Sequence, residues 1–249
     1  MLKKNFAIPV VGFLLANAGY GADDGRVPVL LELFTSEGCS SCPPADQLLE
    51  RLDRDQPMPG AELIVLSEHV DYWNRLGWTD PYSSNQFSRR QEAYAAQFRT
   101  DDIYTPQLVV DGSRQAVGGN WPMAARAIQE SLRERKMPVM VRAAKSKDGV
   151  LVHIEVPRLQ NDGETGVVHL VVAANREKSR VTHGENGGRE LTHVAVVLSL
   201  RQVAKVSSKE GALKDLPVKL NSENTRLILF VQDARTQRVL GVARASFSD

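Results

Sequence analysis

Two cysteines, Cys39 and Cys42, are the only cysteines among the 249 residues of the chain, and they are three positions apart. A CxxC pair can exchange electrons with other thiols, close an inert disulfide, or hold a soft metal ion. A single pair in a chain of this length does not make a disulfide-stapled scaffold. The pair itself is therefore the leading candidate for chemistry.

The pair lies between a predicted strand and a predicted helix. Residues 27–34 (VPVLLELF) form an almost continuous apolar run, which is typical of a strand buried on both faces. Residues 45–53 carry leucines at helical spacing. At the start of a helix, free N–H groups and the helix dipole stabilise a thiolate. This placement predicts that Cys39 is an exposed nucleophile and that Cys42 is its resolving partner.

The rest of the first half predicts an α/β architecture. A second buried strand at residues 63–66 completes a strand–helix–strand unit, which implies a parallel pair with a right-handed crossover. Ser84 is the expected cap of a helix that runs to Phe98. A short strand at residues 108–110 leads through Asp-Gly into a hairpin, and residues 121–136 form the last predicted helix.

The second half has the pattern of antiparallel β-structure. Residues 150–156, 167–173, 227–231 and 239–243 alternate between apolar and polar side chains. We therefore divide the chain into a domain at residues 22–137 and a β-rich C-terminal region at residues 138–249. This region forms either a small sandwich or an extension packed on the first half.

Residues 1–21 have the pattern of a secretory signal peptide. A pair of lysines precedes an apolar run of about ten residues, and small residues follow it. That run is too short to cross a bilayer, so we expect no membrane span in the mature chain. The formal charge of +1 gives no basic field for nucleic acid. We therefore expect a periplasmic or secreted protein that binds no nucleic acid.

Four segments resemble an uncharacterised family of exported bacterial proteins within the thioredoxin superfamily. They are LELFTSEGCSSCPPAD (residues 31–46), HVDYWNRLGWTDPYSS (69–84), YTPQLVVDG (104–112) and HGENGGRELTH (183–193). The resemblance implies a thioredoxin-like sheet with helices and a helical insertion at residues 69–100. It also implies that Pro106, preceded by Thr105, is a cis-proline that faces the CxxC pair.

The chain departs from well-studied thioredoxins near the cysteines. Gly38 replaces their tryptophan, and Leu33 occupies the position of their buried acid. Glu32 is one residue earlier, which on a strand points it to the opposite face. Glu32, His69 and Asp71 are candidate modulators of the cysteine pKa or of proton transfer, because carboxylates and imidazoles tune and relay protons.

The predicted function is that of an exported thiol–disulfide oxidoreductase that needs no bound cofactor. Cys39 and Cys42 would exchange electrons with a protein thiol or disulfide, and Thr105 and Pro106 would hold the substrate segment. Two alternatives remain at this point. The pair can be an inert disulfide, or the domain can be a binding module without turnover. Such a module would hold a peptide, or copper bound by Cys39, Cys42 and His69.

Overall fold

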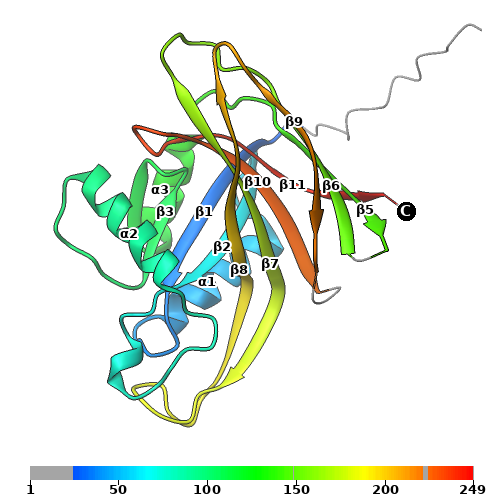
Figure 1. Ribbon diagram of the computed structural model, residues 1–249. Coiled ribbons are helices and arrows are strands. Elements are labelled where there is room, and N and C mark those ends of the chain that lie inside the picture. The colour runs from blue at the N-terminus through cyan, green and yellow to red at the C-terminus, as the bar shows by residue number, and fades with distance from the viewer. Residues whose placement is uncertain (1–24, 148, 221–223, 249) are drawn as a thin grey trace, which may run out of the picture.

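The structure is a computed structural model that describes residues 25–147, 149–220 and 224–248 (Figure 1). The expected signal peptide, residues 1–21, lies outside the described residues. No helix in the described ranges is both long enough and apolar enough to cross a membrane.

The described chain contains three α-helices, one 3₁₀ helix and twelve strands. The helices are α1 (Pro43–Asp55), η1 (Asn74–Leu76), α2 (Asn85–Phe98) and α3 (Trp121–Ser131). The strands of the first half are β1 (Val27–Thr35), β2 (Ala61–His69), β3 (Gln107–Val110) and β4 (Arg114–Val117). Those of the second half are β5 (Met140–Ser146), β6 (Gly149–Val156), β7 (Thr165–Arg180), β8 (Glu190–Ser207), β9 (Ala212–Val218), β10 (Thr225–Asp233), β11 (Val239–Arg244) and β12 (Ser246–Ser248).

A large sheet runs through both halves of the chain. Its strand order is β11-β10-β7-β8-β2-β1-β3-β4, with β1 and β2 parallel and β3 antiparallel to β1. Helices α1 and α3 cover one face, where their leucines and alanines pack on Leu31, Leu33 and Val65. Helix α2 covers the other face, where Phe87 packs near Leu30. Successive residues of β1 therefore point to different layers.

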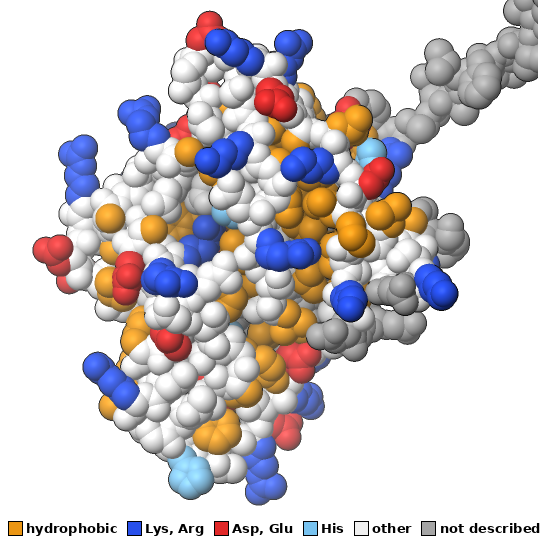
Figure 2. Space-filling view, viewed as in Figure 1, with side chains coloured by type: hydrophobic (Ala, Val, Ile, Leu, Met, Phe, Trp, Pro, Cys, Tyr) orange, Lys and Arg blue, Asp and Glu red, His pale blue; other side chains and the backbone are white. Residues whose placement is uncertain are grey.

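A second, smaller sheet with the order β12-β5-β6-β9 packs against the C-terminal strands of the large sheet. Its alternating apolar side chains share a core with those of β7 and β10. On the face seen in Figure 2, apolar side chains gather between the long β7–β8 hairpin and this sheet.

The expected fold class is confirmed: the protein is α/β, with a β-rich C-terminal region. We left two arrangements open for that region, a small sandwich and an extension packed on the first half, and the structure has features of both. Four of its strands extend the first sheet, and the other four form the small sheet. The cap at Ser84 is also confirmed, because its side chain accepts a hydrogen bond from the Gln86 N–H.

The last predicted helix is shorter than expected. Helix α3 ends at Ser131 instead of residue 136. The following turn brings the Lys136 Nζ to 2.8 Å from the carboxylate of Asp111, which is buried between α3 and β1. The segment after the helix is therefore held by a buried ion pair.

The β7–β8 hairpin is the element that joins the C-terminal region to the CxxC loop. Its two strands span residues 165–207, and its tip, residues 181–189, extends beyond the sheet. Figure 1 shows this tip (yellow) at the same end of the molecule as the loop after β1 and the segment after β2. The hairpin therefore brings residues of the second half to the cysteine pair.

Candidate functional site

Cys39 and Cys42 form a disulfide in the loop between β1 and α1. Two turns shape this loop: the Cys39 N–H donates to the Ser36 carbonyl, and the Cys42 N–H donates to the Cys39 carbonyl, both at 3.2 Å. Helix α1 begins at Pro43, with Cys42 as its N-cap residue. Prolines in the first turn leave no N–H without a partner. Cys42, and not Cys39, therefore lies at the helix terminus.

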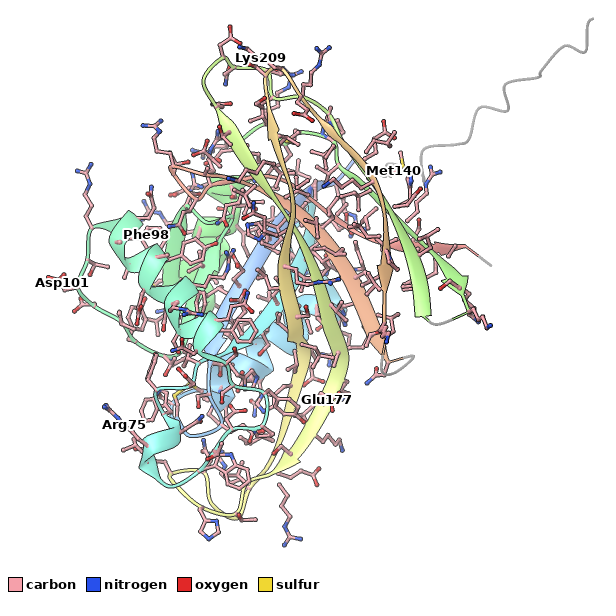
Figure 3. All side chains as sticks on the ribbon, in the orientation of Figure 1. Arg75, Phe98, Asp101, Met140, Glu177 and Lys209 are labelled. Atoms are coloured by element: carbon pink, nitrogen blue, oxygen red, sulfur yellow. A yellow bond between two sulfur atoms is a disulfide. The ribbon has the colours of Figure 1, made fainter. Side chains whose placement is uncertain are left out.

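The segment before β3 lies against the disulfide. The Thr105–Pro106 peptide bond is cis, as the resemblance implies. The Thr105 carbonyl oxygen is 3.9 Å from the Cys39 Sγ, and the Thr105 hydroxyl accepts a hydrogen bond from the Trp73 indole at 2.8 Å. In Figure 3 the yellow disulfide bond lies near the segment that carries Arg75. The structure thus brings Cys39 and Thr105, which are 66 residues apart, into contact.

The expected exposure of Cys39 is wrong, since both cysteines are fully buried. The hydroxyl of Ser41, an exposed residue, lies 3.4 Å from the Cys39 Sγ. The backbone of Gly38 packs closely on Trp73, and a Cβ at Gly38 would come within 3.1 Å of the Trp73 Cβ. The exposed Ser41 therefore contacts the buried Cys39 sulfur, and the Trp73 segment packs on the same loop at Gly38.

The hairpin tip holds the CxxC loop through two neighbouring residues. The buried Asn186 amide donates hydrogen bonds of 2.9 Å to the carbonyls of Glu37 and Cys39. The carboxylate of Glu185 accepts a 3.0 Å hydrogen bond from the Ser40 N–H. The Ser40 side chain and this N–H both stabilise the carboxylate, so the pKa of Glu185 is lowered. The second half of the chain thus fixes the backbone of the cysteine loop.

A histidine from β8 lies between two acids that flank the cysteines. The His193 Nε2 is 3.4 Å from the Glu37 carboxylate, and its Nδ1 is 3.6 Å from the Asp46 carboxylate. All three side chains are buried. Burial lowers the pKa of His193, but the close contacts with the Asp46 and Glu37 carboxylates and their negative charges outweigh burial and raise that pKa to about 10. His193 is therefore an imidazolium at neutral pH.

A second histidine extends this group; we call Glu37, Asp46, His193, His69 and Asp80 the His193 cluster. The rings of His69 and His193 meet edge to face at 4.6 Å. The His69 Nδ1 is 2.7 Å from Asp80, whose carboxylate also accepts a hydrogen bond from the Glu37 N–H at 2.8 Å. Desolvation opposes ionisation of Asp80, yet its hydrogen bonds and the attraction of His69 lower its pKa.

The structure does not assemble the alternative metal site. Within residues 25–147, 149–220 and 224–248, no three His, Cys, Asp or Glu side chains are arranged to hold a metal ion. His69 faces His193 and Asp80, and it forms no such group with Cys39 and Cys42.

Glu32 lies on the α2 face, away from α1. Its carboxylate accepts hydrogen bonds from Arg90 at 2.7 Å and from Tyr94 at 2.6 Å. We call Glu32, Glu68, Arg90, Tyr94 and Gln232 the Arg90 cluster. Burial, together with the charge of Glu32, raises the pKa of Glu68 well above its ordinary value. The third candidate modulator, Asp71, accepts a hydrogen bond from the Ser88 hydroxyl and thereby ties α2 to the end of β2.

Sequence reasoning missed Glu37, Asp46 and His193 as a group. Glu37 and Asp46 lie inside the string around the cysteines, and His193 ends the string at residues 183–193. The sequence contains no signal that β8 lies beside α1, because that contact depends on the path of a long hairpin. The signal available was the presence of acids on both sides of a CxxC pair.

Comparisons with other proteins place the chain in a family. Residues 30–232 match the model of a family described as "Protein of unknown function (DUF1223)". A crystal structure of a protein from Agrobacterium tumefaciens, solved as a structural-genomics target, is similar with a TM-score of 0.70. The two chains are 23% identical, and the match covers 88% of this chain and 94% of the other. None of the curated proteins matches. The family match spans most of the chain, which therefore belongs to the DUF1223 family of proteins of unknown function.

Proposed function

We propose that the protein is an exported thiol–disulfide oxidoreductase with a thioredoxin-like core and that Cys39 and Cys42 are its redox pair. The observation that carries the proposal is the contact of the Cys39 Sγ with the Thr105 carbonyl at 3.9 Å. It joins a CxxC loop after β1 to the segment before β3. The strand order β2-β1-β3-β4, with the CxxC pair at the β1–α1 junction, supports the thioredoxin-like reading.

The reaction uses only the two sulfurs and a partner that carries thiols. A partner thiolate attacks the Cys39 Sγ, a mixed disulfide forms, and Cys42 leaves as a thiolate that takes up a proton. A second partner thiolate then attacks the partner sulfur of the mixed disulfide and releases Cys39. The partner loses two electrons and becomes a disulfide, while the protein gains them as a dithiol. The reverse sequence reduces a partner disulfide.

Cys39 is the sulfur that we assign to the partner. Its Sγ lies beside the exposed Ser41 and the Thr105 backbone, whereas Cys42 is the N-cap of α1. An extended partner segment next to Thr105 can pair with the backbone there. Because Cys39 is fully buried, attack requires the Ser41 side chain or the Trp73 segment to move aside.

Export is part of the proposal and is supported by the pattern of residues 1–21. Disulfides persist in oxidising compartments such as the bacterial periplasm, and the structure carries its cysteines as a disulfide. Fractionation of cells that produce the full chain tests this point. The protein is expected in the periplasm or the medium, with its first residues removed.

The test of the reaction is thiol exchange by the protein without its signal peptide. We expect it to equilibrate with a glutathione buffer and to catalyse reduction of insulin by dithiothreitol. C39S and C42S are expected to abolish turnover, and C42S should trap a mixed disulfide with the partner. A pair that dithiothreitol reduces only in the unfolded protein would identify an inert disulfide and refute the proposal.

A further inference from the structure

We propose that His193 is a positioning residue that sets the reduction potential of the Cys39–Cys42 couple by holding a positive charge between Glu37 and Asp46. This inference rests on the proposed function. It adds a regulator contributed by β8, outside the segment that carries the cysteines.

Two acids lie close to the cysteines along the chain, one before them and one after. Glu37 is two residues before Cys39, and Asp46 is four residues after Cys42. The Asp46 N–H donates a 3.1 Å hydrogen bond to the Cys42 carbonyl. Residues four apart on a helix lie on the same side, so Asp46 is one turn below Cys42. The two carboxylates therefore flank the sulfur pair on both sides along the chain.

Both carboxylates are held in place by other side chains. The Trp78 indole donates to the Glu37 Oε2 at 2.7 Å, and the Thr35 hydroxyl donates to the Asp46 Oδ1 at 3.0 Å. Neither carboxylate can leave its place without losing a buried hydrogen bond. Their charges therefore keep fixed positions on the segments that directly precede and follow the two cysteines.

His193 supplies the cation that these acids contact. Across the described residues, the ion pairs of Glu37 and Asp46 are made with His193 alone. Neither ring nitrogen of His193 has a hydrogen-bond partner, so the contact is one of charge. Burial weakens screening by water, and charges at this distance interact strongly.

The remaining groups that face His193 do not replace that cation. His69 contacts the ring of His193 but is paired with Asp80. Tyr82 lies at 6.1 Å, and burial together with nearby acids raises its pKa to about 12, so it is neutral. Glu177, opposite His193 on β7, accepts from the Tyr82 hydroxyl. In the described part of the chain, none of these three groups forms an ion pair with Glu37 or Asp46.

The charges of the two acids and of His193 affect the stability of the reduced form of the Cys39–Cys42 couple. Reduction converts a neutral disulfide into a dithiol that ionises to a thiolate, and nearby carboxylates disfavour that negative charge. The imidazolium offsets them. Without His193 the reduced form becomes less stable and the potential falls. Without one carboxylate the imidazolium balances the charge of the other, so the net negative charge is lost, the reduced form becomes more stable and the potential rises.

The experiment measures the equilibrium of the disulfide with glutathione at pH 8 for the wild type, H193Q and D46N. Two glutathione thiols give up two electrons, and the products are the protein dithiol and glutathione disulfide. We expect H193Q to disfavour the reduced protein about tenfold, which for this two-electron couple is about 30 mV. D46N is expected to shift the equilibrium by a similar factor in the opposite direction. The double variant should return close to the wild type.

H153Q is the matched control. His153 also pairs with an aspartate, Asp215, at 2.7 Å, but both are largely exposed on the small sheet. The reduction potential of H153Q should equal that of the wild type. If H193Q does not fold, D46N and E37Q test the proposal instead. Both variants keep the imidazolium, and each should raise the reduction potential.

Two results overturn the proposal in distinguishable ways. If the wild type exchanges with glutathione but the variants leave the potential unchanged or shift it in one common direction, the role of His193 is refuted and the oxidoreductase remains. If the folded wild type does not exchange at all, the proposed function fails and this inference fails with it.

Discussion

The His193 cluster and the Arg90 cluster are two buried groups of charges on opposite faces of one sheet. Both lie at the C-terminal ends of β1 and β2. In the Arg90 cluster the guanidinium makes hydrogen bonds of 2.7 to 3.1 Å with Glu32, Tyr94 and Gln232. In the His193 cluster the imidazolium contacts its acids at 3.4 and 3.6 Å without a hydrogen bond.

The two clusters therefore differ in their cation: the guanidinium of Arg90 keeps its proton, whereas the imidazole of His193 can lose it. A guanidinium stays protonated at any ordinary pH and matches its partners with directed hydrogen bonds, so it serves to hold α2 on the sheet. An imidazole can gain or lose its proton. The imidazolium contacts the two acids that flank the cysteines along the chain, and the guanidinium lies on the opposite face of the sheet. We infer that the first cluster tunes chemistry and that the second stabilises the fold.

Replacement of Arg90 by methionine is expected to have the largest effect. It leaves Glu32 and Glu68 buried without their cation, and breaking one partner of a buried pair costs about 3–5 kcal/mol. The measurement is the free energy of unfolding in denaturant.

R126M provides the control, because Arg126 is 83% exposed and pairs with Glu130 on the surface of α3. Its loss should be below about 1 kcal/mol. If the reduction potential also changed in R90M, the proposed separation between the two clusters would be wrong.

The sequence predicted the strands and helices that carry the two clusters better than it predicted which residues form the clusters. The apolar run at residues 27–34, the leucines of α1 and the Asp-Gly hairpin each depend on local patterns, and the structure contains all three elements. The opposite-face position of Glu32 also followed from strand alternation. These features could be predicted because periodicity and turn chemistry are local properties.

The side chains that surround the cysteine loop are brought there by contacts between residues far apart in the sequence. Asn186 and His193 reach the cysteine loop from about 150 residues away. Arg90 reaches Glu32 across 58 residues. The burial of Cys39 has the same origin, since the segment with Trp73 and the hairpin tip come from outside the strand–helix unit. A motif can identify the sulfurs, but it does not state what packs on them.

The next largest expected effect is on the pH dependence of the free energy of unfolding, which should depend on His193 but not on the Arg90 cluster. The folded-state pKa of His193 is raised to about 10 from its ordinary value of 6.5. Its contribution is fully present below the unfolded-state pKa and is lost as pH rises through the folded-state pKa. Between pH 7 and 9 the free energy of unfolding of the oxidised protein should fall by up to about 1.4 kcal/mol per pH unit.

H193Q should remove this slope, and R90K should retain it. The measurement is urea unfolding at several pH values with the disulfide intact. Curves for the wild type and H193Q that stay parallel from pH 7 to 9 would show that His193 carries no raised pKa.

Gly118 offers a smaller, steric test of the site. A Cβ added there would come within 2.8 to 3.0 Å of Leu33, Pro106 and Ala45, so alanine presses on all three side chains, including that of Pro106. We expect G118A to lose about 1–3 kcal/mol of stability and to exchange thiols more slowly.

G166A is the matched control on the C-terminal strands. Its Cβ would come within 2.8 Å of Val206 and Val231, an equally tight position far from the cysteines. A similar loss of stability is expected, with the exchange rate of the folded protein unchanged. Equal slowing in both variants would show that packing strain in general, and not the place of Pro106, limits the reaction.

The smallest expected effect is that of E185Q at the hairpin tip. The Glu185 carboxylate accepts from the Ser40 N–H and places a negative charge over the loop that an attacking thiolate must approach. Glutamine keeps an acceptor oxygen but removes the repulsion, so the rate of reduction by glutathione should rise about two- to fivefold at low salt, with little change in stability. Glu190 lies on the same hairpin, is 67% exposed and pairs with Lys178, so E190Q is the control for a general change in surface charge. An equal rise in both variants, or a rise that persists in high salt, would mean that Glu185 does not guard the disulfide by its charge.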